Sequence, residues 1–327
     1  MRRTCLFAAV LSCLCLAAPA AWGQAASGKT VVVGVLQYTS NNLDTLEGFK
    51  QGMADYGYVE GRNVTYSGGP PASSREELRA RLAELLEAKP DLLFVSPTPA
   101  AVAAKEATRG LGIPVVFAPV NDPVAAGVVE NIARPEGNLT GIRLAPSDGR
   151  RLESLKALKP SIRTVAVPYN SEDESGRESL RQACEAAAAL GLRVAAAPIG
   201  PDRSGEALDG LIPLDADAVF LPRDGLAMSL FRQFGQVAEA RRIPMSTPRY
   251  DQVREGVLAG YGFVGREMGR QAAGMANRLL KGVPVSRVPV ETARDFLFVN
   301  LAAAGRIGLV PPDSVLRQAQ YIIRPGE

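Results

Sequence analysis

The chain has 327 residues, of which 46% are hydrophobic and 22% are charged, and its formal net charge is +3. This length exceeds one minimal domain and suits two lobes of ordinary size, and the mixed charges argue against disorder and against nucleic acid as a partner. The sequence has no histidine, which excludes a serine–histidine triad, an HExxH zinc site and an imidazole base. A GxxxxGK phosphate loop is also missing, so we expect neither an enzyme nor a cofactor.

The first 23 residues have the pattern of a secretory signal peptide. Arg2 and Arg3 precede a short apolar run, and Ala21 and Gly23 offer small residues before a cleavage site. The run is too short for a stable membrane span, with an uncleaved N-terminal anchor as the alternative. Cleavage leaves 35 basic residues (37 less the two arginines) against 34 acidic ones, and leaves Cys184 as the single cysteine. We expect a free periplasmic protein without an internal disulfide, in which Cys184 is a small buried side chain.

Two stretches of the chain repeat the same order of elements. Strand-like apolar runs lie at 31–36, 64–67, 92–95 and 115–118 in the first copy, and at 164–167, 193–196 and 218–221 in the second. Nearly continuous apolar content is typical of strands covered on both faces. Amphipathic helices between the runs, such as 77–88, complete the alternation of parallel strands with right-handed crossovers. The repeat therefore predicts an α/β protein with two Rossmann-like lobes and a seam between them.

The order of elements places several chain crossings between the lobes. The first is expected near residues 142–145, the second near Phe263, and the third near residues 289–294. The helix expected from 264 to 280 follows the second copy and returns to the first lobe. Short crossings of this kind permit the lobes to close around a ligand. The expected domains are a signal peptide (1–23), an N-terminal lobe (29–143 and 264–291) and a C-terminal lobe (144–263 and 292–323).

Ligands of open parallel sheets bind outside the carboxyl ends of the strands, and this rule selects six loops of the repeat. Ser96 and Thr98 can hold a carboxylate at a helix start. Asp122 or Asp224 can pair with an ammonium group, which can also rest against a tyrosine face. These residue types suit a small zwitterion with an apolar or aromatic body. The candidate ligand-binding residues are Tyr38, Ser96, Thr98, Asn121, Asp122, Tyr169, Asn170, Asp224 and Tyr250.

The same residues have structural alternatives. The hydroxyls of Ser96 and Thr98 could cap the helix that follows them. The aspartates of these loops could hold turns, and Tyr250 could pack beneath its own loop. Arg223 and Arg249, which lie next to candidates, are expected to be charges at the rim of the site.

Three motifs resemble a known family. They are Gly-Met-Ala-Asp-Tyr-Gly-Tyr-Val-Glu-Gly-Arg-Asn-Val at 52–64, Asp-Pro-Val-Ala-Ala-Gly at 122–127 and Pro-Glu-Gly-Asn-Leu-Thr-Gly at 135–141. They are similar to motifs of the ABC-transporter substrate-binding proteins that include tryptophan- and tyrosine-binding members, and the similarity runs from about Thr30 to Pro312. The resemblance implies a type I periplasmic-binding-protein fold with a multi-crossover hinge. The family's contacts to an aromatic amino acid match Tyr38, Ser96, Thr98, Asp122, Asn170 and Asp224.

Two loops of the second lobe depart from the family pattern. The sequence Asn-Ser-Glu-Asp-Glu-Ser at 170–175 is shorter and more acidic than the family's Asn-Pro-Ser-Glu-x-Asn-Ser, and Arg-Asp-Gly at 223–225 stands where many members have Thr-Asp-Asn. From the resemblance we expect a monomeric receptor that captures an amino-acid-like ligand, aromatic ones included, by hinge closure. It would deliver this ligand to an ABC permease of the inner membrane. A ligand-sensing module for a membrane signalling protein is the alternative.

Overall fold

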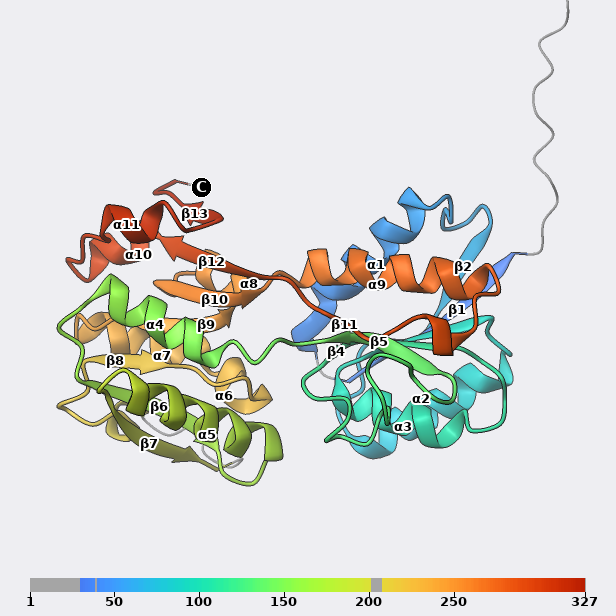
Figure 1. The fold of residues 1–327 in the computed structure, drawn as a ribbon, viewed down its shortest axis with the longest axis horizontal. Helices are drawn as coiled ribbons and strands as arrows, with labels where there is room; N and C mark the ends of the chain where they lie inside the picture. The colour runs from blue at the N-terminus through green and yellow to red at the C-terminus, as the bar shows by residue number, and fades with distance from the viewer. Residues whose placement is uncertain (1–29, 39, 201–207, 327) are drawn as a thin grey trace, which may run out of the picture.

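The computed structural model describes residues 30–38, 40–200 and 208–326, and the expected signal peptide lies outside these ranges. The described residues form two α/β lobes that lie side by side along the longest axis of the molecule (Figure 1). Each lobe has one sheet with helices on both faces. None of the described helices is both long enough and apolar enough to cross a membrane.

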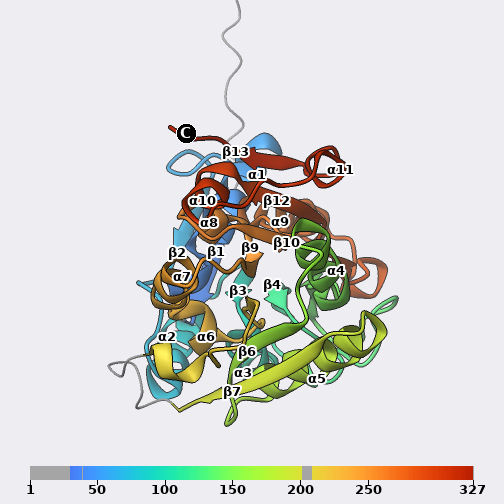
Figure 2. The same ribbon diagram turned by 90° about the vertical axis from the view of Figure 1, so that its left-hand side faces the viewer.

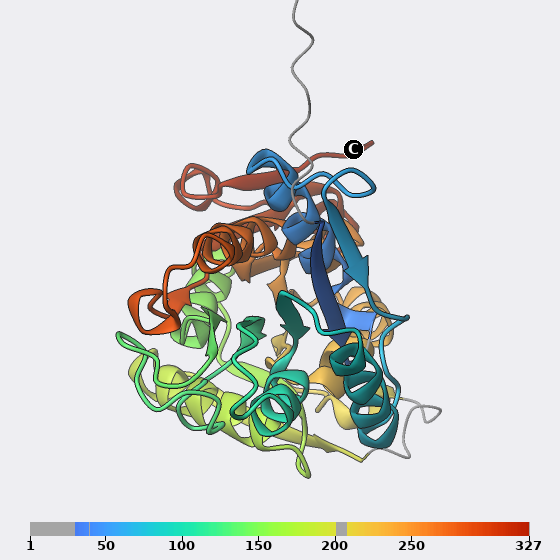
Figure 3. The same ribbon diagram turned by 90° about the vertical axis from the view of Figure 1, so that its right-hand side faces the viewer.

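Lobe one contains a parallel six-stranded sheet, in the order β11-β5-β4-β3-β1-β2. Its side chains alternate between two helix layers, as period-two strands require. Leu92 and Phe94 pack with α1 and α9, whereas Leu93 and Val95 pack with α2 and α3. The two helix layers lie on opposite faces of the sheet (Figure 3). The strands are β1 (Val31–Gln37), β2 (Val64–Ser67), β3 (Leu92–Ser96), β4 (Val115–Val120), β5 (Leu139–Arg143) and β11 (Glu291–Thr292). The helices are η1 (Ser40–Asn42), α1 (Leu43–Asp55), α2 (Arg75–Glu87), α3 (Thr98–Ala107), α9 (Gly265–Leu280) and η4 (Val285–Arg287).

Helix α9 follows the second copy of the repeat but packs against α1 in lobe one (Figure 1). Glycines on both helices allow their backbones to approach closely. A Cβ at Gly48 would lie 2.0 Å from the carbonyl oxygen of Arg266, and one at Gly269 would lie 2.0 Å from that of Thr45. Helix α9 can therefore pack this closely against α1 because glycines, which have no Cβ, lie at the contact.

Lobe two contains a seven-stranded sheet, in the order β13-β12-β10-β9-β8-β6-β7. The parallel arrangement predicted from the sequence does not extend to β12, which is antiparallel to β10. The chain enters β12 from lobe one, at the seam, so this strand runs away from the seam while β10 runs toward it. The strands are β6 (Thr164–Asn170), β7 (Arg193–Ile199), β8 (Ala218–Phe220), β9 (Met245–Arg249), β10 (Ala259–Phe263), β12 (Asp295–Asn300) and β13 (Tyr321–Ile323).

Helices cover both faces of this sheet, with α4 and α5 on one face and α6 and α7 on the other (Figure 2). Cys184 of α5 is exposed, which corrects the expected buried thiol. The helix turns Ala183 and Ala187 into the core instead, so the neighbouring Cys184 points outward. The helices are α4 (Asp148–Leu158), α5 (Glu174–Ala189), η3 (Leu208–Leu211), α6 (Gly225–Ser229), α7 (Phe231–Ala240), α8 (Tyr250–Arg254), α10 (Leu301–Arg306) and α11 (Asp313–Leu316).

The described chain passes between the two sheets at three places: from β5 to α4, from β10 to α9, and from β11 to β12. The first and third crossings lie side by side, because Arg143 Nε donates a hydrogen bond to Thr292 Oγ1 at 3.0 Å. Each crossing is short, so a change in the backbone conformation of a few residues can move one lobe relative to the other.

Candidate ligand-binding site

The carboxyl ends of strands from the two lobes meet at the seam. Arg249 is the last residue of β9 in lobe two, and Asn42 is the last residue of η1, which follows β1 in lobe one. Arg249 Nη1 donates a hydrogen bond to Asn42 Oδ1 at 3.1 Å. The loops that follow these strand ends therefore face each other, as the binding rule for open sheets requires.

Ser96 and Tyr38 lie together at the end of the lobe-one sheet, where the Tyr38 N–H donates to the Ser96 carbonyl oxygen at 2.8 Å. Ser96 is 1% exposed, and its Oγ has no hydrogen-bond partner within the described part of the chain. It does not cap α3, whose first residue is the half-buried Thr98 and whose start has no side-chain cap. A buried hydroxyl without a partner costs free energy, and a helix start favours an anion. This corner can therefore hold a carboxylate once the residues that cover Ser96 move to admit it.

Asn121 and Asp122 follow β4, the next strand in the sheet. Asn121 is half-buried and Asp122 is exposed. Asp122 Oδ1 accepts hydrogen bonds from the N–H groups of Val124 and Ala125, each at 3.0 Å. The carboxylate thus holds its own turn in this conformation, and a ligand contact from Asp122 stays a prediction.

Asn170 and Asp224 are joined at the end of the lobe-two sheet. Asp224 Oδ2 accepts a hydrogen bond from the Asn170 N–H at 2.9 Å, and its Oδ1 accepts one from the Ala227 N–H at 2.7 Å as the N-cap of α6. Asp224 is 0% exposed, and burial raises the pKa of its carboxyl group, although the hydrogen bonds oppose this. The side chain therefore shapes the loop, and a direct contact with a ligand amine, which stays a prediction, would require the loop to open.

The two lobe-two tyrosines differ in their surroundings. Tyr169 is half-buried near the end of β6. The ring of Tyr250 lies 4.6 Å from that of Tyr321 and 5.2 Å from that of Phe298, measured between centroids. Tyr250 therefore packs in an aromatic cluster of its own lobe, and its role as a ligand contact is untested.

Arg223 and Arg249 are not rim charges, because they are only 9% and 4% exposed. Arg223 Nη2 donates to Gln182 Oε1 at 2.8 Å, and its Nη1 donates to the carbonyl oxygen of Ala145 in the first crossing. The same guanidinium also lies 3.4 Å from the buried carboxylate of Asp148. These partners of Arg223 are distant in sequence, so no local signal could have revealed them.

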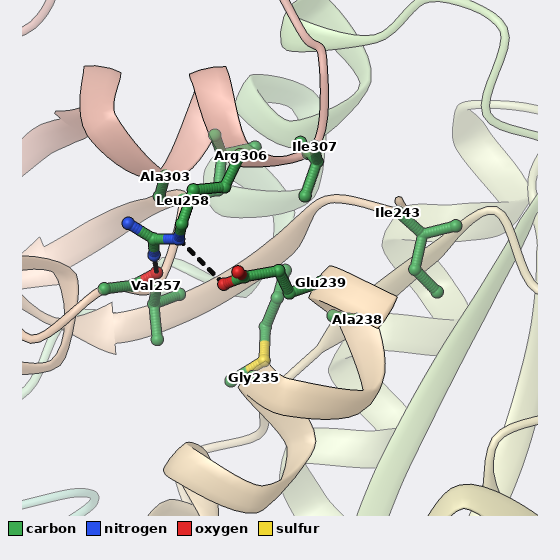
Figure 4. Close-up of a pocket in the computed structure, with 11 residues that line it drawn as sticks. Gly235, Ala238, Glu239, Ile243, Val257, Leu258, Ala303, Arg306 and Ile307 are labelled. Carbon is green, nitrogen blue, oxygen red and sulfur yellow. Dashed lines mark hydrogen bonds and ion pairs between the residues drawn. The ribbon is translucent and has the colours of Figure 1, made fainter. Parts of the chain in front are cut away.

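No group of three or more acidic, cysteine or histidine side chains that could hold a metal ion occurs in the described residues. A separate pocket lies between α7 and α10 in lobe two, where Arg306 Nε donates to Glu239 at 2.8 Å (Figure 4). It is lined by Met245 and Leu258, which lie at the amino ends of β9 and β10. This pocket is therefore at the opposite end of the sheet from the candidate site.

Relatives of the chain bind small molecules. It is 27% identical to a tyrosine-binding protein of Clostridioides difficile over 81% of this chain and 77% of the relative. A solved structure from Streptococcus pneumonia, in complex with L-Trp, has a TM-score of 0.80 at 24% identity and covers 90% of this chain and 100% of that one. A ligand-free, open substrate-binding protein with adhesive properties from Clostridium difficile has a TM-score of 0.72 at 25% identity, covering 91% and 100%.

These similarities fit the two lobes described above, and the fold is that of type I periplasmic binding proteins. The proteins concerned are ligand-binding proteins rather than enzymes. The family model described as ABC transporter substrate binding protein matches residues 31–323, nearly all that the structure describes. The chain belongs to the family of ABC transporter substrate-binding proteins.

Proposed function

We propose that the chain is the periplasmic receptor of an ABC importer and that it captures an amino acid, aromatic ones included, between its lobes. The receptor would act as a monomer and deliver the ligand to a permease in the inner membrane. Family membership supports the transport role, and the tyrosine-binding relative and the L-Trp complex of similar fold support the ligand class. The observation that carries the proposal is the buried, unpartnered hydroxyl of Ser96 at the seam.

In this proposal the ligand carboxylate accepts a hydrogen bond from Ser96 Oγ and lies at the start of α3. A hydrogen bond to a charged group contributes about 1.5–3 kcal/mol, and the helix start adds a smaller favourable interaction. A micromolar affinity corresponds to about −8 kcal/mol. Most of the binding free energy must therefore come from burying the ligand body as the lobes close.

Calorimetric titration with matched ligands tests the proposal. L-Tyrosine, L-tryptophan and L-phenylalanine form one set, and tyramine and tryptamine, which keep the ring and amine but lack the carboxylate, form the other. The proposal predicts that at least one amino acid binds and that its decarboxylated partner binds at least tenfold more weakly. Equal binding of the two sets, or no binding of any amino acid, would contradict it.

The transport role requires a separate measurement. Cells that carry the gene should release the mature protein with the periplasmic fraction and should take up the labelled amino acid. Uptake should fall when either the receptor or its permease is deleted. Uptake that persists without the receptor would point instead to a sensing role.

A further inference from the structure

One guanidinium group connects the two lobes beside the second chain crossing. Arg249 of lobe two donates from Nη1 to Asn42 Oδ1 at 3.1 Å, and its Nη2 lies 3.6 Å from Asp44 Oδ1. Asn42 immediately precedes α1 and Asp44 lies in its first turn, both in lobe one. The contact is removed from solvent, because Arg249 is 4% exposed and Asn42 is 6% exposed.

Each side of this contact is held in place by its own lobe. In lobe two, Asp251 accepts hydrogen bonds from Arg249 Nε at 2.9 Å and from Nη2 at 2.8 Å, which fixes the plane of the guanidinium. In lobe one, Gln37 Nε2 donates to the Asn42 carbonyl oxygen at 3.2 Å. Burial alone would lower the pKa of Arg249, but Asp251 and Asp44 raise it, so the group stays charged. The two halves are therefore preorganised, and the link between them can form without reordering either lobe.

The link also lies at the hinge. The Arg249 guanidinium is 5.8 Å from the ring centroid of Phe263, the last residue of β10 before the second crossing. Asp44 packs against Gly265, the first residue after the crossing, where a Cβ would lie 2.1 Å from Asp44 Oδ2. A contact at this place bears directly on the angle between the lobes.

We propose that Arg249 is a positioning residue for ligand binding: its hydrogen bond to Asn42 favours the arrangement in which the lobes are together. The inference rests on the proposed capture of a ligand between the lobes. A ligand that bridges the lobes and a hydrogen bond that bridges them favour the same arrangement, so each lowers the cost of forming the other. Removing the link shifts the population toward separated lobes and lowers the apparent affinity by the same factor.

Small-angle X-ray scattering of the ligand-free protein tests the link without any knowledge of the ligand. The variants are Arg249→Met, Asn42→Ala and the double variant. The control is Arg306→Met, which removes the ion pair between Arg306 and Glu239 within lobe two. Asn42→Ala is the milder change, because the Asn42 side chain makes no capping hydrogen bond to α1. The radius of gyration should increase in both single variants, and the double variant should not exceed Arg249→Met, since Arg249→Met already removes the hydrogen bond to Asn42. It should not change in Arg306→Met.

Titration with L-tryptophan then measures the effect on affinity. Each single variant should bind about tenfold more weakly, as expected for loss of one hydrogen bond to a charged group. An unchanged radius together with an unchanged affinity in Asn42→Ala would overturn the proposal, even if Arg249→Met fails to fold. If L-tryptophan and the other amino acids do not bind the wild type, the proposed function fails, and the scattering comparison alone decides the role of Arg249.

Discussion

Two buried serines near the strand ends differ in their hydrogen bonds. Ser96 Oγ has no partner in the described chain. Ser179 Oγ, by contrast, donates to Asp148 Oδ2 at 3.0 Å and accepts from the Arg223 N–H at 3.1 Å. A satisfied hydroxyl supports the fold, whereas an unsatisfied one is a cost that a ligand can remove.

The pair gives a matched prediction. Ser96→Ala should leave the free energy of unfolding unchanged or slightly higher, and should weaken amino-acid binding tenfold to about a hundredfold. Ser179→Ala should lower the free energy of unfolding by about 1–3 kcal/mol, because it leaves buried partners unsatisfied. Urea denaturation and calorimetric titration measure the two effects. A Ser96→Ala variant that binds as the wild type does would remove this hydroxyl from the site.

At the level of single residues, the ligand-binding site stays a prediction, but the structure shows what several of the candidate side chains contact. Ser96 is a candidate because it ends an apolar run just before a helix, and the structure adds that its hydroxyl is buried without a partner in the described chain. Asp224 lies at the expected strand end but uses both oxygens on its own loop, one of the alternatives left open by the Asp-Gly sequence. The burial of Arg249 was not predictable, because Asn42, to which it donates a hydrogen bond, lies 207 residues away in the sequence, and an arginine is usually exposed unless it is paired.

At the level of elements, the repeat is visible in hydrogen bonds as well as in strand order. Asp91 precedes β3 and accepts from the Val32 N–H of β1 at 2.9 Å. Asp217 precedes β8 and accepts from the Arg163 and Thr164 N–H groups at the start of β6, at 2.8 and 2.9 Å. The two aspartates therefore fix equivalent strand pairs in the two lobes.

This role predicts a pH dependence for Asp217. Burial alone would raise the pKa of its carboxyl group, but the hydrogen bonds from Thr164 and Arg163 hold it below the ordinary value of 3.8. A lowered folded-state pKa stabilises the protein above the unfolded pKa, and this stabilisation is lost as pH falls through the folded value. Asp217→Asn should therefore be less stable than the wild type in urea at pH 7, with a smaller difference at pH 3. A difference that is equal at both pH values would exclude the ionised carboxylate as its cause.

The contact between α1 and α9 gives a prediction about the return of the chain to lobe one. Gly269→Ala places a Cβ against the backbone of Thr45 and should lower the free energy of unfolding by about 1–3 kcal/mol through overpacking. Gly235→Ala in α7 is the control, because nothing lies within 4 Å of its Cβ position; it should raise stability by about 0.5–1 kcal/mol. Thermal and urea unfolding compare the two. Equal changes in the free energy of unfolding for the two variants would mean that the close approach of α1 and α9 does not contribute to stability.

The seven strand-like runs predicted from the sequence begin where the structure begins β1 to β4 and β6 to β8, whereas the strands β5, β9 and β10 were not predicted. The runs near β1, β3 and β6 begin where the structure begins these strands, because strands buried on both faces need apolar residues at every position. The direction of β12 was not predictable, since it depends on the third crossing and not on the strand's own residues. The repeat indicated two lobes but gave no information about how the strands added after it would pair.

For the whole molecule, the central point is that strand ends of the two lobes face each other across a seam joined by three short crossings. The contact of Arg249 with Asn42 shows this directly, and Ser96 supplies a buried donor, without a partner in the described chain, at the end of β3, which pairs with β1. The pocket between α7 and α10 lies at the other end of lobe two. The proposed function therefore places the ligand at the seam and not in the pocket between α7 and α10.

A crystal structure of the protein grown with the amino acid that binds most tightly in calorimetry tests this account most directly. The account predicts a ligand between the lobes, with its carboxylate within hydrogen-bond distance of Ser96 Oγ at the start of α3. A ligand located in the pocket between α7 and α10, or one whose carboxylate points away from α3, would contradict it.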